Sequence, residues 1–416
     1  MQRFVAPLVV VVPFCFCVVV AVVASGCVAD ANGDEPEPLP FAPADADHAP
    51  DPSVLGPYPV GVRTHELVDD LRLEEQPDGA RAPRRLPLEV WYPAKESARD
   101  ADKEVIHLFD ALPPDLQEGL TEEALGALPT VAVRDAPARD DGDRYPLVVF
   151  SHGKGGIRLQ SNFYTGYLAS HGYVVVAPDH TGDTIVELLR EVKDTGNIQA
   201  DSTVEAIVDR PKDVIAILDL IDDVLVDQGS DDVAALVDLD HVGVTGHSFG
   251  ALTSFLVATM DSRVDTIVGQ TPTSQDVVAL QQQTPIEDVK IPMYVQSAHL
   301  DGTLPEETNA KPLYETLTSQ KAWLSLNRAG HFTYSDLCVL DVAAISVAVG
   351  LDVSNVLDDG CGADAIPPAL SEPAIRSSAI GAFNLHLRGS TDSARFLTQQ
   401  ALDAIAPGEG TLVSSP

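Results

Sequence analysis

The sequence is short of basic residues. Lys and Arg number 26 among 416 residues, whereas Asp and Glu number 63, and the formal net charge at pH 7 is −37. A surface this acidic repels phosphate backbones and anionic lipid headgroups, so nucleic acid is not an expected partner. Apolar residues make up 45% of the chain, which excludes a largely disordered protein.

Cysteine is also scarce, with five residues, and three of them lie near the N-terminus. Arg3 precedes an almost wholly apolar stretch over residues 4–24, and small residues lead directly to Cys27. This pattern is typical of an export signal, and its end resembles the bacterial lipoprotein cleavage box, although Ala24 stands where that box most often has Leu. We predict a lipoprotein-type signal peptide over residues 1–26 and lipidation of Cys27. The alternative is an uncleaved anchor, because about 20 apolar residues can span a bilayer.

The next segment has the composition of a tether. Residues 28–58 contain seven acids, seven prolines and no Lys or Arg, a composition that cannot bury a core. We therefore expect residues 27–58 to link a globular domain, residues 59–416, to a lipid anchor. These features predict export to the bacterial cell envelope, on the periplasmic or surface side. The membrane is then a partner only through the anchor, and the oligomeric state stays open.

Two cysteines remain in the predicted domain, Cys338 and Cys361. Two cysteines in an exported domain favour one disulfide. The alternative is a pair of unpaired buried thiols, since free cysteine is often part of a core.

From residue 59 onward, short apolar runs alternate with helical patterns. We predict an early hairpin and a series of strands and helices; the strands lie at residues 60–68, 86–92, 146–150, 173–177, 241–245, 264–268, 292–296 and 322–326, and the helices at 162–170, 211–225 and 251–260. Such alternation is typical of a mostly parallel central sheet flanked by helices on both faces. Residues 95–143 are longer than an ordinary connection, and their apolar spacing predicts an inserted segment of short amphipathic helices.

One motif carries chemistry, the Gly-x-Ser-x-Gly at residues 246–250. It lies between a predicted strand and a predicted helix, the context of a nucleophile elbow, in which a tight turn exposes the serine oxygen above the sheet. We therefore predict Ser248 as a nucleophile. The bare pattern occurs by chance, and its strand–turn–helix context gives it weight.

A serine nucleophile needs a base, and the base needs an orienting carboxylate. Chain order in this architecture is Ser, acid, His. Asp301 follows a predicted strand and is the expected acid, and His331 follows the next strand and is the expected base. The rival residues are less suitable in their predicted positions: Asp265, Asp276 and Asp288 as acids, His299 and His386 as bases.

An oxyanion hole completes such a site. One donor is expected to be the backbone N–H of Phe249, directly after the nucleophile. The other is expected from the glycine-rich residues 152–156 after an early strand, because glycine allows close approach of the backbone to a substrate. We predict the Lys154 N–H for this role, with the Gly155 N–H as the alternative. We expect no cofactor and no metal.

Five segments together resemble the α/β-hydrolase superfamily: residues 149–153 (VFSHG), 177–180 (APDH), 209–213 (DRPKD), 246–250 (GHSFG) and 330–338 (GHFTYSDLC). Within it they are similar to the bacterial branch near platelet-activating-factor acetylhydrolases, dienelactone hydrolases and cutinase-like polyesterases. The resemblance implies an α/β-hydrolase fold and a serine esterase with Ser248, Asp301 and His331 in the triad positions. It also implies an oxyanion N–H at Lys154.

Two departures narrow the resemblance. The animal acetylhydrolases place their acid after the strand that follows the elbow, where residues 267–271 contain no carboxylate. The dienelactone enzymes usually have Cys where Ser248 stands. The expected function is therefore an exported serine carboxylic-ester hydrolase that forms an acyl-enzyme from small-molecule esters of short to medium acyl length. The alternative is a catalytically silent hydrolase fold that serves as a surface binding lipoprotein.

Overall fold

The computed structural model describes residues 49–75, 79–195, 201–349 and 357–415. All of them belong to one compact unit. The predicted signal peptide (residues 1–26), Cys27 and residues 28–48 of the tether lie outside the described residues, so these stay predictions. The rest of the predicted tether, residues 49–58, is part of the domain instead: Ala49 and Tyr58 are buried in its core, and the Tyr58 N–H donates to the carbonyl of Ser170 at 3.0 Å. Within the described ranges, no helix is both long enough and apolar enough to cross a membrane.

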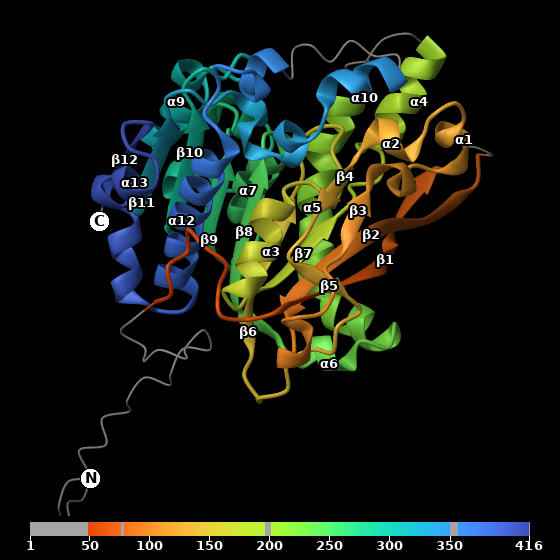
Figure 1. Cartoon of the computed structure of the whole chain (residues 1–416), viewed down its shortest axis with the longest axis horizontal. Coiled ribbons are helices and arrows are strands. Elements are labelled where there is room, and N and C mark those ends of the chain that lie inside the picture. Colours follow the sequence, from red (N-terminus) through yellow and green to blue (C-terminus); the bar gives the residue numbers. More distant parts are fainter. Residues whose placement is uncertain (1–48, 76–78, 196–200, 350–356, 416) are drawn as a thin grey trace, which may run out of the picture. The chain divides into compact units, whose positions relative to one another are not determined.

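The main sheet has the strand order β12-β11-β10-β9-β8-β6-β7-β2-β1-β5 (Figure 1). Strands β7, β6, β8, β9, β10 and β11 pair in parallel, whereas β1 with β2, β2 with β7 and β11 with β12 are antiparallel. The strands are β1 (Val60–Glu75), β2 (Arg81–Pro93), β5 (Ala132–Arg134), β6 (Tyr145–Ser151), β7 (Val174–Pro178), β8 (Val237–His247), β9 (Val264–Gln270), β10 (Met293–Ala298), β11 (Lys321–Leu326) and β12 (Gly410–Ser415). A separate small sheet pairs β3 (Val105–His107) with β4 (Ala127–Pro129).

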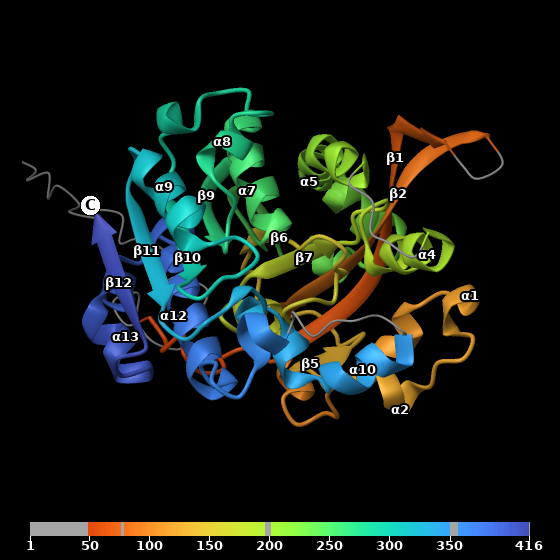
Figure 2. The same cartoon turned by 90° about the horizontal axis from the view of Figure 1, so that it is seen from above.

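Helices cover both faces of the main sheet (Figure 2). One layer contains α5 (Asp201–Asp227), α6 (Asp231–Ala234), α7 (Phe249–Met260), α8 (Gln275–Val278) and α9 (Ala310–Thr316). The other contains α3 (Asn162–Ser170), α12 (Pro368–Leu387) and α13 (Gln399–Ile405). Strand β6 shows why two layers form: Leu147 and Val149 face the first, whereas Val148 and Phe150 face the second. Successive side chains of a strand point to opposite faces of the sheet. All four side chains are buried because helices cover both faces.

The insertion, residues 95–143, is more varied than the predicted helices. Its α1 (Pro114–Gln117) and α2 (Glu122–Leu125) are single turns, and its last strand, β5, joins the edge of the main sheet beside β1. Two more helices lie beside it: α4 (Ile185–Thr195), which packs with α1, and α10 (Val342–Val349), which packs with α2 (Figures 1 and 2). The insertion is therefore part of a cap built from three separate stretches of chain.

Several elements are longer than predicted: β1 ends at Glu75, β2 begins at Arg81 and β8 begins at Val237. The helix expected to begin at Pro211 begins at Asp201, and Pro211 lies inside α5. Proline removes one backbone donor from a helix interior, which is why it suggested a first turn. The apolar face of α5 offsets that loss: Val214, Ile217 and Ile221 are buried against the sheet.

Candidate active site

The elbow forms as predicted between β8 and α7. Ser248 has φ 57° and ψ −115°, a strained conformation for a residue with a side chain. Both flanking glycines are needed for space: a Cβ at Gly246 would lie 2.5 Å from the carbonyl oxygen of Ser151, and one at Gly250 would lie 1.9 Å from it. Strand β6 therefore passes so close to the turn that no other residue fits at either position.

Three side chains predicted to act together form one hydrogen-bonded chain. His331 Nε2 lies 2.7 Å from Ser248 Oγ, and His331 Nδ1 lies 2.8 Å from Asp301 Oδ2. The three follow β8, β10 and β11, whose carboxyl ends meet at one edge of the sheet. His331 and Asp301 are buried, whereas Ser248 is partly exposed. This arrangement can take a proton from the serine hydroxyl and stabilise the imidazolium that results.

A second carboxylate, Asp359, holds the loops of the acid and the base together. Its Oδ1 accepts the backbone N–H groups of His331 (2.8 Å) and Gly302 (2.9 Å). Its Oδ2 accepts the backbone N–H and the hydroxyl of Thr303, at 2.9 and 2.8 Å. Asp301 is fixed in turn, because its Oδ1 accepts the N–H of Leu304 at 2.6 Å. Sequence reasoning missed Asp359, since a single Asp in no motif gives no signal.

The rival residues have other contacts. Asp265 accepts the backbone N–H of Val242 at 2.8 Å at the start of β9. His386 lies 2.6 Å from the hydroxyl of Tyr294, and burial lowers its pKa to about 4. His299 is half-exposed, with Nδ1 3.3 Å from Glu306. Asp276 lies in α8 and Asp288 in the single turn at residues 286–288, and neither directly follows a strand of the main sheet.

The predicted oxyanion loop, residues 152–156, lies against the elbow. A Cβ on Gly153 would come within 3.6 Å of Ser248 Cβ, so Gly153 gives the loop its close approach. Lys154 and the positive-φ Gly155 follow directly. Phe249 is the first residue of α7, and first-turn N–H groups have no acceptor within their own helix. The structure thus places both segments named as oxyanion donors beside the nucleophile.

A chain of hydrogen bonds through two neutral side chains, Gln160 and His247, connects the oxyanion loop to the backbone of His331. Gln160 Oε1 accepts the Gly153 N–H at 3.1 Å, and Gln160 Nε2 lies 3.0 Å from His247 Nδ1. Because Gln160 donates to Nδ1, His247 carries its proton on Nε2, which donates to the carbonyl of His331 at 2.9 Å. Burial lowers the pKa of His247 to about 3, which keeps the ring neutral.

The predicted disulfide is confirmed. Cys338 and Cys361 are bonded, with Cα atoms 4.7 Å apart. The bridge joins the segment after His331 to the segment that carries Asp359. The disulfide therefore closes the loop that carries Asp359, the residue that accepts the backbone N–H of His331.

An apolar cluster of the insertion packs against α4, a helix that contacts the oxyanion loop. Leu112, Leu116 and Leu125 of the insertion pack with residues of α4 and α10. Leu188 of α4 lies over the loop, since a Cβ on Gly155 would be 2.9 Å from its Cδ2. Ile106 and Leu128 of the insertion also pack near the site. They contact Ile157 and Leu159, which follow the oxyanion loop, and Leu340, which follows the segment of His331. The insertion thus reaches the site through α4 and through these neighbours.

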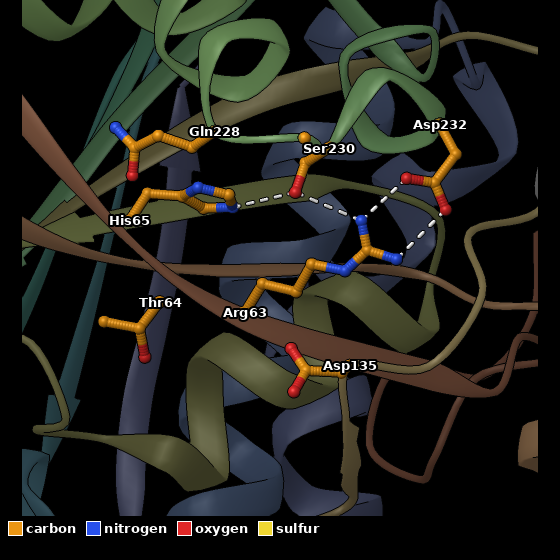
Figure 3. A pocket seen from close by; sticks show the side chains of 8 residues that line it. Arg63, Thr64, His65, Asp135, Gln228, Ser230 and Asp232 are labelled. Atoms are coloured by element: carbon orange, nitrogen blue, oxygen red, sulfur yellow. Dashed lines mark hydrogen bonds and ion pairs between the residues drawn. The ribbon is translucent and has the colours of Figure 1, made fainter.

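A cavity of about 440 Å³ lies elsewhere, near the amino ends of β1 and β8 (Figure 3). Two of its charged groups pair with each other: Arg63 contacts both carboxylate oxygens of Asp232, at 2.6 and 3.0 Å. Ser230 bridges Arg63 and His65. Across the described ranges, no group of three or more His, Cys, Asp or Glu is placed to hold a metal ion.

Comparisons with known proteins agree with this geometry. The profile of the PET hydrolase-like family matches residues 140–349, half of the chain. The chain belongs to this family. The profile for platelet-activating factor acetylhydrolase, isoform II, matches residues 47–197. The PET hydrolase-like match spans β6 to α10 and includes all three triad positions.

Relatives of the PET hydrolase-like chain are named as ester hydrolases. The platelet-activating factor acetylhydrolase of Canis lupus familiaris is 31% identical over 33% of this chain and 37% of its own length. Cutinase 1 of Thermobifida cellulosilytica is 26% identical over 46% and 62%. The chain thus spans less than two thirds of these relatives. A ferulic acid esterase structure from Streptomyces cinnamoneus superposes with a TM-score of 0.59 at 25% identity, covering 80% of this chain and 91% of that one. It confirms the predicted α/β-hydrolase fold.

Proposed function

We propose that this protein is a serine carboxylic-ester hydrolase that works through an acyl-enzyme. The observation that carries the proposal is the hydrogen-bonded chain Ser248–His331–Asp301 at a strained elbow. Membership of the PET hydrolase-like family and the names of its relatives support it.

In the first half-reaction, Ser248 Oγ bonds to the ester carbonyl carbon while its proton passes to His331 Nε2. The carbonyl electron pair moves onto oxygen, where the N–H groups of Lys154 and Phe249 stabilise the charge. The carbon–oxygen bond to the alcohol then breaks, and His331 returns the proton to the departing alkoxide. Asp301 keeps Nδ1 protonated and stabilises the transient imidazolium. Water repeats the sequence on the acyl-enzyme, which releases the acid and restores the Ser248 hydroxyl.

The proposed substrates are small esters with acyl groups of about two to eight carbons. The apolar cluster of the insertion, α4 and α10 supports this range, because α4, which contributes to it, also places Leu188 against Gly155 of the oxyanion loop on which the ester carbonyl would rest. Each buried methylene then contributes about 0.8 kcal/mol until the available apolar surface is filled.

We further propose that the enzyme is exported and held in the cell envelope through a lipid on Cys27. The support is the sequence of residues 1–58 alone. Replacing Cys27 by Ala should abolish palmitate labelling and partition into detergent. Membrane retention with an unprocessed N-terminus would instead favour the uncleaved anchor.

The decisive experiment for the activity is hydrolysis of a panel of p-nitrophenyl esters by the parent protein and by Ser248→Ala. The variant should lose several orders of magnitude in kcat, leaving only binding and oxyanion contributions. A fluorophosphonate probe should label the parent and not the variant. A parent protein that is neither labelled nor active would favour the silent binding lipoprotein.

A further inference from the structure

Arg210 has no place in the proposed triad, yet it contacts the loop beside it. It lies on α5 and is 1% exposed. Its Nη1 donates to the carbonyl of His152 at 2.6 Å, and its Nη2 donates to the carbonyl of Gly153 at 3.0 Å. Asp183 neutralises it, with Oδ2 2.9 Å from Nη2. Burial lowers the pKa of Arg210 to about 10, so the guanidinium stays charged at neutral pH.

These contacts fix the direction of one backbone N–H. The Gly153 carbonyl also accepts from His152 Nδ1 at 2.7 Å and from the Gly156 N–H at 3.0 Å. In a trans peptide the carbonyl and the following N–H point in opposite directions. Three donors on the Gly153 oxygen therefore hold the Lys154 N–H pointing away from Arg210.

The tautomer of His152 is part of this arrangement. His152 Nε2 accepts the backbone N–H of His180 at 3.2 Å, so the ring proton lies on Nδ1 and is available to the Gly153 carbonyl. Burial lowers the pKa of His152, and the adjacent Arg210 lowers it further. The ring is thus neutral and adds a donor without adding a second buried charge.

The same guanidinium also touches the other oxyanion segment. Its central carbon lies 4.8 Å from the centre of the Phe249 ring, within the range of a cation–π contact. One buried cation therefore contacts the two stretches of chain whose N–H groups, Lys154 and Phe249, would meet the oxyanion.

We propose that Arg210 is a positioning residue that orients both donors of the oxyanion hole. The inference rests on the proposed function, since an oxyanion exists only if Ser248 attacks a carbonyl. It predicts that loss of Arg210 damages stabilisation of the developing charge and leaves the proton relay of His331 and Asp301 intact.

The test compares p-nitrophenyl acetate with its thionoester, in which sulfur replaces the carbonyl oxygen. Sulfur is a weak hydrogen-bond acceptor, so an oxyanion hole accelerates the oxygen ester selectively. The ratio of the two kcat/KM values does not depend on the fraction of folded enzyme, so it stays informative for a destabilised variant. Arg210→Lys keeps a cation opposite Asp183 but lacks the planar fork that serves two carbonyls. Arg210→Gln keeps one donor and no charge.

We expect both variants to lower the oxygen-to-sulfur ratio about tenfold or more, through kcat rather than KM. The matched control is Arg376→Lys. Arg376 is similarly buried; it donates to the carbonyls of Phe163 and Ser53 and to Glu372, and its guanidinium lies over the Tyr167 ring, so its contacts lie outside residues 152–156 and α7. This control should lose stability and keep the oxygen-to-sulfur ratio. An unchanged ratio in the Arg210 variants of an active parent overturns this inference alone. An equal fall in the Arg376 control also overturns it. Absence of Ser248-dependent hydrolysis in the parent overturns the proposed function and this inference with it.

Discussion

The carboxylate of Asp359 accepts the backbone N–H of His331 at 2.8 Å, although 28 residues separate the two in the sequence. The same carboxylate accepts from Gly302 and Thr303, directly after Asp301. The loops that carry Asp301 and His331 are therefore joined by hydrogen bonds from one carboxylate to their backbone N–H groups.

Replacing Asp359 by Asn should lower kcat about 10- to 100-fold. The amide removes the charge and cannot accept as many bonds, and a hydrogen bond to a charged group is worth about 1.5–3 kcal/mol. Kinetics on p-nitrophenyl acetate check the prediction. Asp358→Asn is the control, because Asp358 is adjacent and exposed. Equal activity in the two variants would contradict the proposed role of Asp359 in holding the loops of Asp301 and His331.

The acid is tested by Asp301→Asn. The amide presents an N–H or an oxygen to His331 without a charge, so kcat should fall about 10³- to 10⁴-fold with little change in KM. Asp265→Asn serves as the matched control because that carboxylate accepts the Val242 N–H at the far end of the sheet from the triad positions. A larger loss in the Asp265 variant would show that the acid is misassigned.

Removing the disulfide should destabilise the fold. The Cys338→Ser, Cys361→Ser double variant opens a loop that spans 23 residues, which in the chain-entropy model is worth roughly 3 kcal/mol. Urea unfolding with and without reductant measures the loss. Because the loop carries Asp359, kcat should fall together with stability. Two thiols titrating in the denatured, unreduced protein would rule the bridge out.

One pH dependence follows from a buried histidine far from the triad. His171 lies 3.0 Å from the carbonyl of Val54, and burial lowers its pKa to about 4. In the unfolded chain the His pKa is about 6.5. Between pH 6.5 and 4 the imidazole is therefore protonated in the unfolded chain and neutral in the folded chain. Its contribution to stability is complete above pH 6.5 and is lost as pH falls toward 4.

His171→Gln removes that proton. Below pH 6.5 the unfolding free energy of the parent should fall relative to that of the variant, by up to about 1.4 kcal/mol per pH unit. Urea titrations at several pH values between 7.5 and 4.5 measure it. A pH-independent difference would show that His171 is protonated equally in both states.

The apolar cluster predicts a change in chain-length preference. Leu112→Ala or Phe109→Ala should shift the optimum among p-nitrophenyl esters and spare acetate cleavage, because only longer acyl groups reach this surface. Leu402→Ala is the control, since Leu402 of α13 is buried in an apolar cluster separate from that of Leu112. Retention of the parental preference by both insertion variants would place the acyl group elsewhere.

Much of the sheet could be predicted because its strands are buried on both faces. Strands β6, β7 and β10 each lie within two residues of their expected bounds, since continuous apolar runs leave little freedom of register. Strand β12 was missed, because residues 410–415 (GTLVSS) carry a weak pattern and pair only at the edge. The members of the proposed triad were found from one motif and the chain order. Asp359 and Gln160 were missed, because their roles depend on contacts between distant loops.

The order of the strands also sets when the site can exist. Ser248 follows β8, but its partners follow β10 and β11, and Asp359 comes later still. A nascent chain that has emerged only to residue 290 contains the elbow and the oxyanion loop without acid or base. The proposed activity therefore becomes possible only late in synthesis, after the segment that carries Asp359 has been added.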